Sequence, residues 1–230
     1  MTREELLQKI ADRKDGERLD FNHLEMKNTD FSGCDLRNCD FSWADFEGCC
    51  FDGAILDDSS FEHGLMPHCS FRGASLRNVC LSAVNLRWSD FTDAHAEGAN
   101  FFMAVMEYTI NDGILIDDAT QWYRMHCPET GAFVAYKKCF DMRLVQLLVP
   151  ADARRVSPTS PWGRCDKAKV LSIWSFDGKE RFTEATSLQT DNFVYPLGEW
   201  VEEPRFNPDR WLESAPGIHF WMTRQEAFDY

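Results

Sequence analysis

The sequence predicts a mainly β protein built from two structured parts. From Leu19 to Asp118 a five-residue rhythm runs without a gap. After Asp118 the rhythm stops, and short runs rich in β-branched and aromatic residues alternate with Gly, Pro and Asp turn signals. We therefore expect an N-terminal capping helix at residues 1–16, a repeat domain at 17–118 and a β-rich α+β domain at 119–230.

The repeat consists of twenty consecutive groups of five residues, in which the third position is large and apolar and the first is mostly small. The third position is Phe, Leu, Met or Ile in all groups except those with Ala96 and Asn111. Neither a helical nor a strand period explains this spacing. The pattern resembles the pentapeptide-repeat family, which implies a right-handed quadrilateral β-helix with four pentapeptides per coil. The resemblance thus predicts about five coils, or about 24 Å of solenoid at ~4.8 Å per strand spacing, with the third-position side chains on the axis.

A short amphipathic helix is expected at residues 2–15, because the ends of a solenoid require caps. Thr2 and Glu5 have the spacing of a capping box, and Gly16 can end the helix. The apolar face would consist of Leu6, Leu7 and Ile10.

The repeat carries nearly all of the formal net charge of −14, because residues 17–118 hold 19 acidic side chains against 6 basic ones. The resulting density is about one charge per ~1.8 Å of solenoid axis, close to that of duplex DNA at ~1.7 Å. Some members of the resembled family are DNA mimics that occupy the DNA-binding groove of an enzyme such as gyrase. Such a surface attracts a basic partner and opposes direct binding to nucleic acid.

The acidity is uneven along the repeat. Residues 39–58 have a net charge of −6, whereas residues 59–78 have +1. The acidic surface is therefore interrupted, whereas the negative charge of DNA is continuous. An ordinary solvated surface is the alternative interpretation of such a cluster. The expected partner-binding acidic face comprises Asp40, Asp45, Glu47, Asp52, Asp57 and Asp58.

The second half is similar to a domain of unknown function that follows pentapeptide repeats in phage and bacterial proteins. The similarity rests on the segments VPADARRVSP from residue 149, KAKVLSI from 167, VYPLGEWVE from 194, FNPDRW from 206 and APGIHFWMTRQEA from 215. The usual pattern has Cys where this chain has Ser214, so a role for that thiol is not expected here. The resemblance implies a phage or prophage origin and no particular activity. Thr223 and Glu226 predict a capped closing helix.

A basic cluster is predicted in a loop between two strands of this domain. It would bind phosphate or an acidic partner, or it would dock on the acidic repeat of the same chain, and both interpretations stay open. Its members are Arg154, Arg155, Arg164, Lys167 and Lys169.

For the remaining candidate catalytic and metal-binding residues, the sequence favours a structural role. His219, within GIHFW, is better explained as a hydrogen-bonded strand residue than as a general base. The GIHFW stretch, with Ala227 and Tyr230, is similar to part of ADP-ribosyltransferases. A set of one histidine and three cysteines lacks the paired spacing of structural zinc, and it consists of His126, Cys127, Cys139 and Cys165. We therefore expect no catalytic, cofactor-binding or metal-binding residue and no cofactor.

The functional hypothesis is an acidic protein-binding module, a phage or prophage inhibitor of a bacterial enzyme that handles nucleic acid or acts in defence. The alternatives are an NAD-dependent ADP-ribosyltransferase-like enzyme in the C-terminal domain and a structural or virion assembly component. The expected partner is a host protein with a basic surface. The exposed hydrophobic residues Phe102, Met103 and Tyr108 would bury against the C-terminal domain or against a second subunit in a homodimer. The lack of a membrane-length apolar run and of a signal-peptide core predicts the cytoplasm of a bacterial host.

Overall fold

The computed structural model describes residues 1–189 and 193–230, and it divides into two compact units, Met1–Arg124 and Met125–Tyr230. The first unit, the repeat unit, extends past Asp118, because backbone pairing continues to Gln121, which bridges to Asn100. The second, the C-terminal unit, contains most of the regular strands. In the described part of the chain, no helix has the length and hydrophobicity that a bilayer crossing requires.

Helix α1 (Arg3–Ala11) begins with the predicted capping box, in which the Thr2 hydroxyl accepts from the Glu5 amide and the Glu5 carboxylate accepts from the Thr2 amide. The helix is shorter than the predicted 2–15 because a turn follows it, closed by a 3.0 Å bond from the Glu17 amide to the Lys14 carbonyl. Of its expected apolar face, Leu6 and Ile10 are buried and Leu7 is half-buried.

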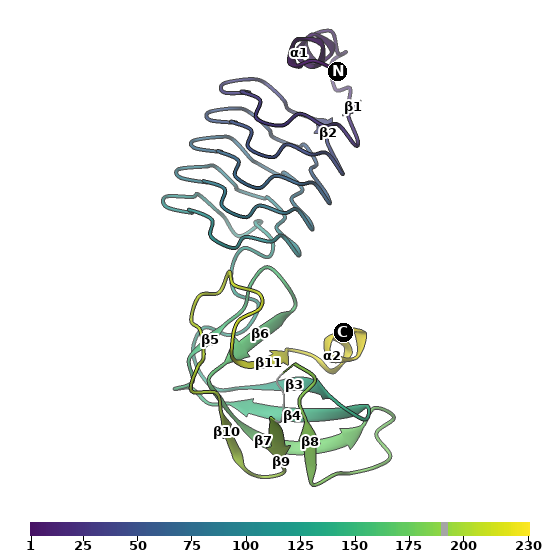
Figure 1. Cartoon of the computed structure of the whole chain (residues 1–230), viewed down its shortest axis with the longest axis vertical. Coiled ribbons are helices and arrows are strands. Elements are labelled where there is room, and N and C mark those ends of the chain that lie inside the picture. The colour runs from purple at the N-terminus through teal and green to yellow at the C-terminus, as the bar shows by residue number, and fades with distance from the viewer. Residues whose placement is uncertain (190–192) are drawn as a thin grey trace. The chain divides into compact units, whose positions relative to one another are not determined.

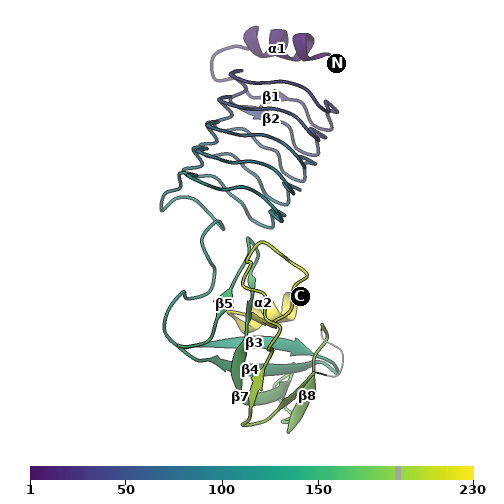
Figure 2. The same ribbon diagram turned by 60° about the vertical axis from the view of Figure 1, so that its left-hand side comes forward.

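The repeat is held together by four ladders of parallel backbone bridges, which join residues twenty positions apart except at the last bridge, where Asn100 pairs with Gln121. Figure 1 shows the stacked layers that these ladders connect. Asp45 bridges to Leu65, for example, and the Phe41 amide donates to the Ser60 carbonyl at 2.7 Å. Only β1 (Leu19–Asp20) and β2 (Cys39–Asp40) are continuous enough to count as strands. Figure 2 shows the resulting stack of layers from another side, and we call each ladder with its flanking residues a side of this solenoid-like unit.

The large third-position side chains fill the interior of the stack, as predicted. Phe51 is 0% exposed and stacks between Phe31 and Phe71, with ring centroids 5.3 and 5.2 Å apart. Residues twenty positions apart therefore supply each other's aromatic contacts, and offset stacking adds to the free energy of burial.

In the first nineteen groups, up to Gly113, the fifth position turns the chain from one side to the next with a positive φ, for example 59° at His23 and 63° at Trp43. Gly48 has φ 71°, and a Cβ there would also collide with the Asn28 side chain of the neighbouring layer.

The C-terminal unit is built on one antiparallel sheet of seven strands in the order β10-β7-β4-β3-β11-β6-β5. A separate antiparallel pair, β8 and β9, and the short helix α2 complete it. The elements are β3 (Phe133–Cys139), β4 (Arg143–Val149), β5 (Arg155–Val156), β6 (Trp162–Cys165), β7 (Lys167–Ser175), β8 (Glu184–Thr186), β9 (Val194–Pro196), β10 (Trp200–Glu202), β11 (Ile218–Trp221) and α2 (Arg224–Asp229).

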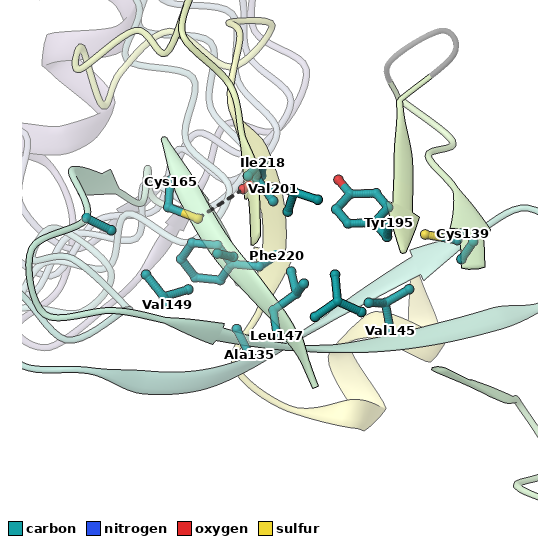
Figure 3. Packing of buried hydrophobic residues seen from close by; sticks show 14 of the residues in the cluster. Ala135, Cys139, Val145, Leu147, Val149, Cys165, Tyr195, Val201, Ile218 and Phe220 are labelled. Carbon is teal, nitrogen blue, oxygen red and sulfur yellow. Dashed lines mark hydrogen bonds between the residues drawn. The ribbon is translucent and has the colours of Figure 1, made fainter. Parts of the chain in front are cut away.

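The main core of this unit lies on one face of the sheet, where Leu147, Phe220 and Tyr195 pack together (Figure 3). Side chains alternate along β11, so Trp221 points to the opposite face and packs with Ala227 of α2. Helix α2 begins with the predicted capping box between Thr223 and Glu226. The unit is thus an antiparallel sheet with a distinct cluster on each face.

Candidate functional site

The six predicted acidic residues do not share one face of the repeat. Each step of five residues moves the chain to the next ladder, so the residues occupy four sides of one layer. Asp40 lies on the ladder that continues to Ser60, whereas the Asp45 ladder continues to Leu65. Glu47 shares the side of Asp45, Asp52 lies on the third side, and Asp57 and Asp58 lie on the fourth. The predicted face is therefore a belt around the stack, because proximity in sequence does not give a common orientation in a chain that turns every five residues.

Most of these carboxylates also have partners within the repeat. Asp45 and Glu47 hold the Lys27 ammonium at 2.7 and 2.9 Å, and their hydrogen bonds raise the pKa of Lys27. Asp52 and Asp57 accept from backbone amides of the next layer at 3.1 and 3.0 Å. These contacts stabilise the stack and leave the carboxylates partly accessible.

The acidity is greatest on two neighbouring sides, which we call the acidic sides. They comprise residues 29–38, 49–58, 69–78, 89–98 and 109–118, which hold eleven acidic residues against three basic ones. The other two sides, over the corresponding ranges from 19 to 108, hold seven against two. The acidic sides include the exposed residues Asp58, Asp93 and Asp112.

Four members of the predicted basic loop lie in strands β5 to β7, Arg154 directly precedes β5, and two members, Arg155 and Arg164, are buried. Arg155 in β5 is 8% exposed and donates to the carbonyls of Pro150, Ala151 and Ala153. Arg164 in β6 is 0% exposed. Both guanidinium groups serve as internal donors for loop carbonyls, a role that sequence position does not reveal.

The other three members of the cluster remain at the surface, each with a neighbour. Arg154 pairs with Asp166 at 2.8 Å, and Lys167 pairs with Asp152 at 2.7 Å. The Lys169 ammonium lies 5.9 Å from the centre of the Trp200 ring. Each of these three cations thus has a neighbour within the unit, and the binding of phosphate or of an acidic partner by the cluster stays a prediction.

A cavity of about 710 Å³ lies in the C-terminal unit and includes His219 in its wall. His219 is half-buried in β11, and its Nδ1 atom is buried without a hydrogen-bond partner among the described residues. Burial, together with the nearby cations of Lys137 and Arg164, lowers the pKa of His219 to about 3. The imidazole is therefore neutral near pH 7. His219 is a strand residue as predicted, but its Nδ1 atom lacks the predicted hydrogen bond among the described residues.

Arg164 fixes the wall of this cavity. Its guanidinium donates to the carbonyls of Asn207, Asp209, Leu212 and Pro216 at 2.8–3.3 Å, so one side chain holds the whole loop that precedes β11. A Cβ at Gly217 would come within 2.9 Å of the Arg164 side chain, which explains the glycine there. The loop contributes Ser214 to the lining, at the position where the resembled domain has Cys.

The histidine and three cysteines weighed as zinc ligands lie in different surroundings. Cys127, Cys139 and Cys165 are buried, and burial raises the pKa of each thiol. His126 lies 3.1 Å from the Glu226 carboxylate. No group of three or more potential ligands is assembled in residues 1–189 and 193–230.

Sequence reasoning missed two exposed stacks of planar side chains at the turns of the repeat. Trp43 stacks between His23 and His63, with centroids 6.3 and 4.2 Å apart, and Trp88 stacks between His68 and Tyr108 at 4.9 and 5.6 Å. A twenty-residue spacing of aromatic and histidine residues at the fifth position would have revealed them.

Comparisons with known proteins agree with this architecture. A pentapeptide repeat region matches residues 34–109, and a family of unknown function, DUF5758, matches residues 123–227. No curated protein sequence matches the chain significantly.

Similar solved structures come from several sources. A pentapeptide repeat protein from the thylakoid lumen of Arabidopsis thaliana is 25% identical over 46% of this chain and 70% of its own, with a TM-score of 0.35. QnrB1, a plasmid-mediated fluoroquinolone resistance protein, is 15% identical over 46% and 75%, with a TM-score of 0.30. HetL, a regulator of heterocyst differentiation in the cyanobacterium Nostoc, is 12% identical over 50% and 94%, with a TM-score of 0.16. The chain therefore consists of a pentapeptide repeat region followed by a domain of the DUF5758 family.

Proposed function

We propose that this protein is an acidic binding module whose repeat binds a basic surface on a partner protein. The carrying observation is the concentration of charge on the acidic sides, where eleven acidic residues oppose three basic ones. In this proposal the repeat is a right-handed quadrilateral β-helix of about five coils, whose paired backbone holds the carboxylates in fixed rows. Preorganised charge of one sign accelerates association and selects a complementary surface.

The partner we propose is a bacterial enzyme that handles nucleic acid or acts in defence, inhibited by a phage or prophage protein. A groove that binds DNA is lined with Lys and Arg, and the carboxylates on the acidic sides offer it charges of the same sign as those of phosphates. Direct binding of nucleic acid by the repeat is opposed by the same charges.

The test is an affinity pull-down of the full chain from bacterial lysate, with the bound proteins identified by mass spectrometry. We expect a partner that is retained at 50 mM salt and lost as the salt rises, because exposed charges are screened. A triple variant in which Asp58, Asp93 and Asp112 are changed to Lys should no longer capture this partner.

The matched control carries the same change of charge on the other two sides, at the exposed residues Asp20, Glu25 and Glu62. Equal loss of capture in both triple variants would assign the effect to net charge alone and contradict a role for the acidic sides. The captured enzyme is then assayed with and without the wild-type chain, and unchanged activity at saturation would refute inhibition.

A further inference from the structure

The cavity of the C-terminal unit is walled by aromatic rings from three elements. Trp162 of β6 and Trp221 of β11 are paired in register, and Tyr230 follows α2. The Trp162 ring lies 5.6 Å from that of His219, and the Tyr230 ring lies 4.6 Å from that of Trp221. Such walls favour a flat ligand, because stacking on aromatic rings is both apolar and geometrically selective.

The polar groups of the wall are mostly acceptors. Glu203 is 4% exposed, and its hydrogen bonds from Arg205 hold the pKa of its carboxyl below the usual range, so it is ionised at neutral pH. A carboxylate has more acceptor sites than one guanidinium occupies. Gln189 and His219 also line the cavity, and His219 adds the unsatisfied buried Nδ1. A buried ring nitrogen without a partner is destabilising, so its retention in a cavity wall indicates a polar ligand that completes the hydrogen bond, and this nitrogen accepts when the ring proton lies on Nε2.

The charges around the cavity select against ions of either sign. Burial, and after it the cations of Lys137 and Arg164, lower the pKa of His219, and the field of these cations opposes a cationic ligand. Ionised Glu203 opposes an anionic one, and Arg205, the cation in the wall, is already paired with it at 3.0 Å. The charges of the cavity therefore favour a neutral ligand.

We propose that this cavity binds a neutral planar heteroaromatic molecule with N–H donors, the chemistry of a nucleobase or nucleoside. The ring would stack on Trp162, and its donor edge would meet the Glu203 carboxylate. This inference is independent of the protein-binding function proposed for the repeat.

The experiment is isothermal titration of the full chain with guanosine, whose base has adjacent N–H donors on one edge. We expect saturable binding of one guanosine per chain. Trp162→Ala and Glu203→Gln should each weaken it about tenfold or more, equivalent to about 1.4 kcal/mol. Trp200→Ala removes a tryptophan that is 52% exposed and does not line the cavity, so it should leave binding unchanged.

Two charged comparators sharpen the result. Guanosine 5′-monophosphate carries an anion and agmatine carries a guanidinium cation, and each should bind at least about tenfold more weakly than guanosine, a difference of about 1.4 kcal/mol. Tighter binding of either comparator, no saturable guanosine binding, or guanosine binding that is insensitive to both cavity variants would overturn the proposal. If Trp162→Ala does not fold, Trp162→Phe and the nearly isosteric Glu203→Gln decide the question.

Discussion

The two units of this protein place charge in opposite locations. In the repeat unit the buried polar residues among those described are hydroxyl-bearing, such as Ser59 and Ser89, and the charged side chains lie outside. In the C-terminal unit four charged residues are buried: Lys137, Arg155, Arg164 and Glu203. In the periodic unit the backbone amides and carbonyls find their hydrogen-bond partners in the next layer. In the aperiodic unit, individual charged side chains such as Arg164 bind the loop carbonyls instead.

The reason lies in how backbone groups find partners. Each layer of the repeat donates to the next, as when the Phe51 amide bonds to the Ser70 carbonyl at 2.7 Å. The hydroxyl of Ser59 fills a remaining gap by donating to the Leu36 carbonyl at 2.9 Å. The loop at residues 207–216 has no such neighbour layer, and Arg164 supplies its donors instead.

The largest expected change in stability comes from a substitution in the aromatic interior of the repeat. Phe51→Ala should lower the free energy of unfolding by about 3–5 kcal/mol, because it leaves a cavity between two stacked rings. Urea denaturation of the full chain measures the change, and hydrogen exchange should show faster exchange at residues 19–118. Phe102→Ala, at a ring 37% exposed, is the control and should cost clearly less. Equal losses would mean that the stacked interior is not the source of stability.

The second expected change in stability comes from replacing Arg164, the hydrogen-bond donor that holds the loop before β11 in the C-terminal unit. Arg164→Met keeps much of the side-chain volume but removes the guanidinium donor of four carbonyls, of which that of Pro216 keeps the Asn207 amide as a donor, so we expect a loss of about 3 kcal/mol. Arg154→Met, at an exposed ion pair, should change the free energy of unfolding by about 1 kcal/mol or less. A stable Arg164→Met variant would show that the loop holds its conformation by other contacts.

The third effect tests the buried lysine. Burial lowers the pKa of Lys137 from 10.5 to about 8, and its ammonium donates to Gln189 at 2.6 Å. The folded state releases its proton near pH 8 while the unfolded chain retains it to about 10.5, so wild-type stability should rise with pH across this window. Lys137→Met should therefore stabilise the protein at pH 7, on the order of 2 kcal/mol.

Thermal unfolding of both proteins at several pH values measures this difference. The advantage of the variant should be constant below pH 8 and shrink toward pH 10.5. An advantage that grows with pH would reverse the assigned direction of the pKa shift.

The smallest effect concerns thiol accessibility and involves no change of stability. Cys34, Cys50 and Cys80 are partly exposed, whereas the other six cysteines are buried, so a disulfide reagent should label only these three in the native protein. All three lie in the repeat unit, and peptide mapping after labelling identifies them. Labelling of Cys127, Cys139 or Cys165 in the native protein would contradict the closed core of the C-terminal unit.

Much of the fold could be predicted from the sequence. The five-residue spacing identified which side chains fill the repeat, and the Thr2–Glu5 and Thr223–Glu226 spacings identified both capped helices. The candidate sites were harder to predict. Asp45 and Asp58 are near in sequence but lie on different sides, and Arg155 and Arg164 read as surface charges although both are buried.

By itself, the sequence determined the periodic part of this protein, because in the repeat the backbone bridges recur at a separation of twenty residues until the last one, between Asn100 and Gln121. Only the tertiary structure decided which acidic residues share a side, which cations are internal, and that Trp162, Glu203 and His219 meet around one cavity. In this aperiodic unit, Trp162 lies in β6, His219 lies in β11 and Glu203 directly follows β10. Long-range strand pairing and the loop held by Arg164 bring them together, and no local spacing encodes that geometry.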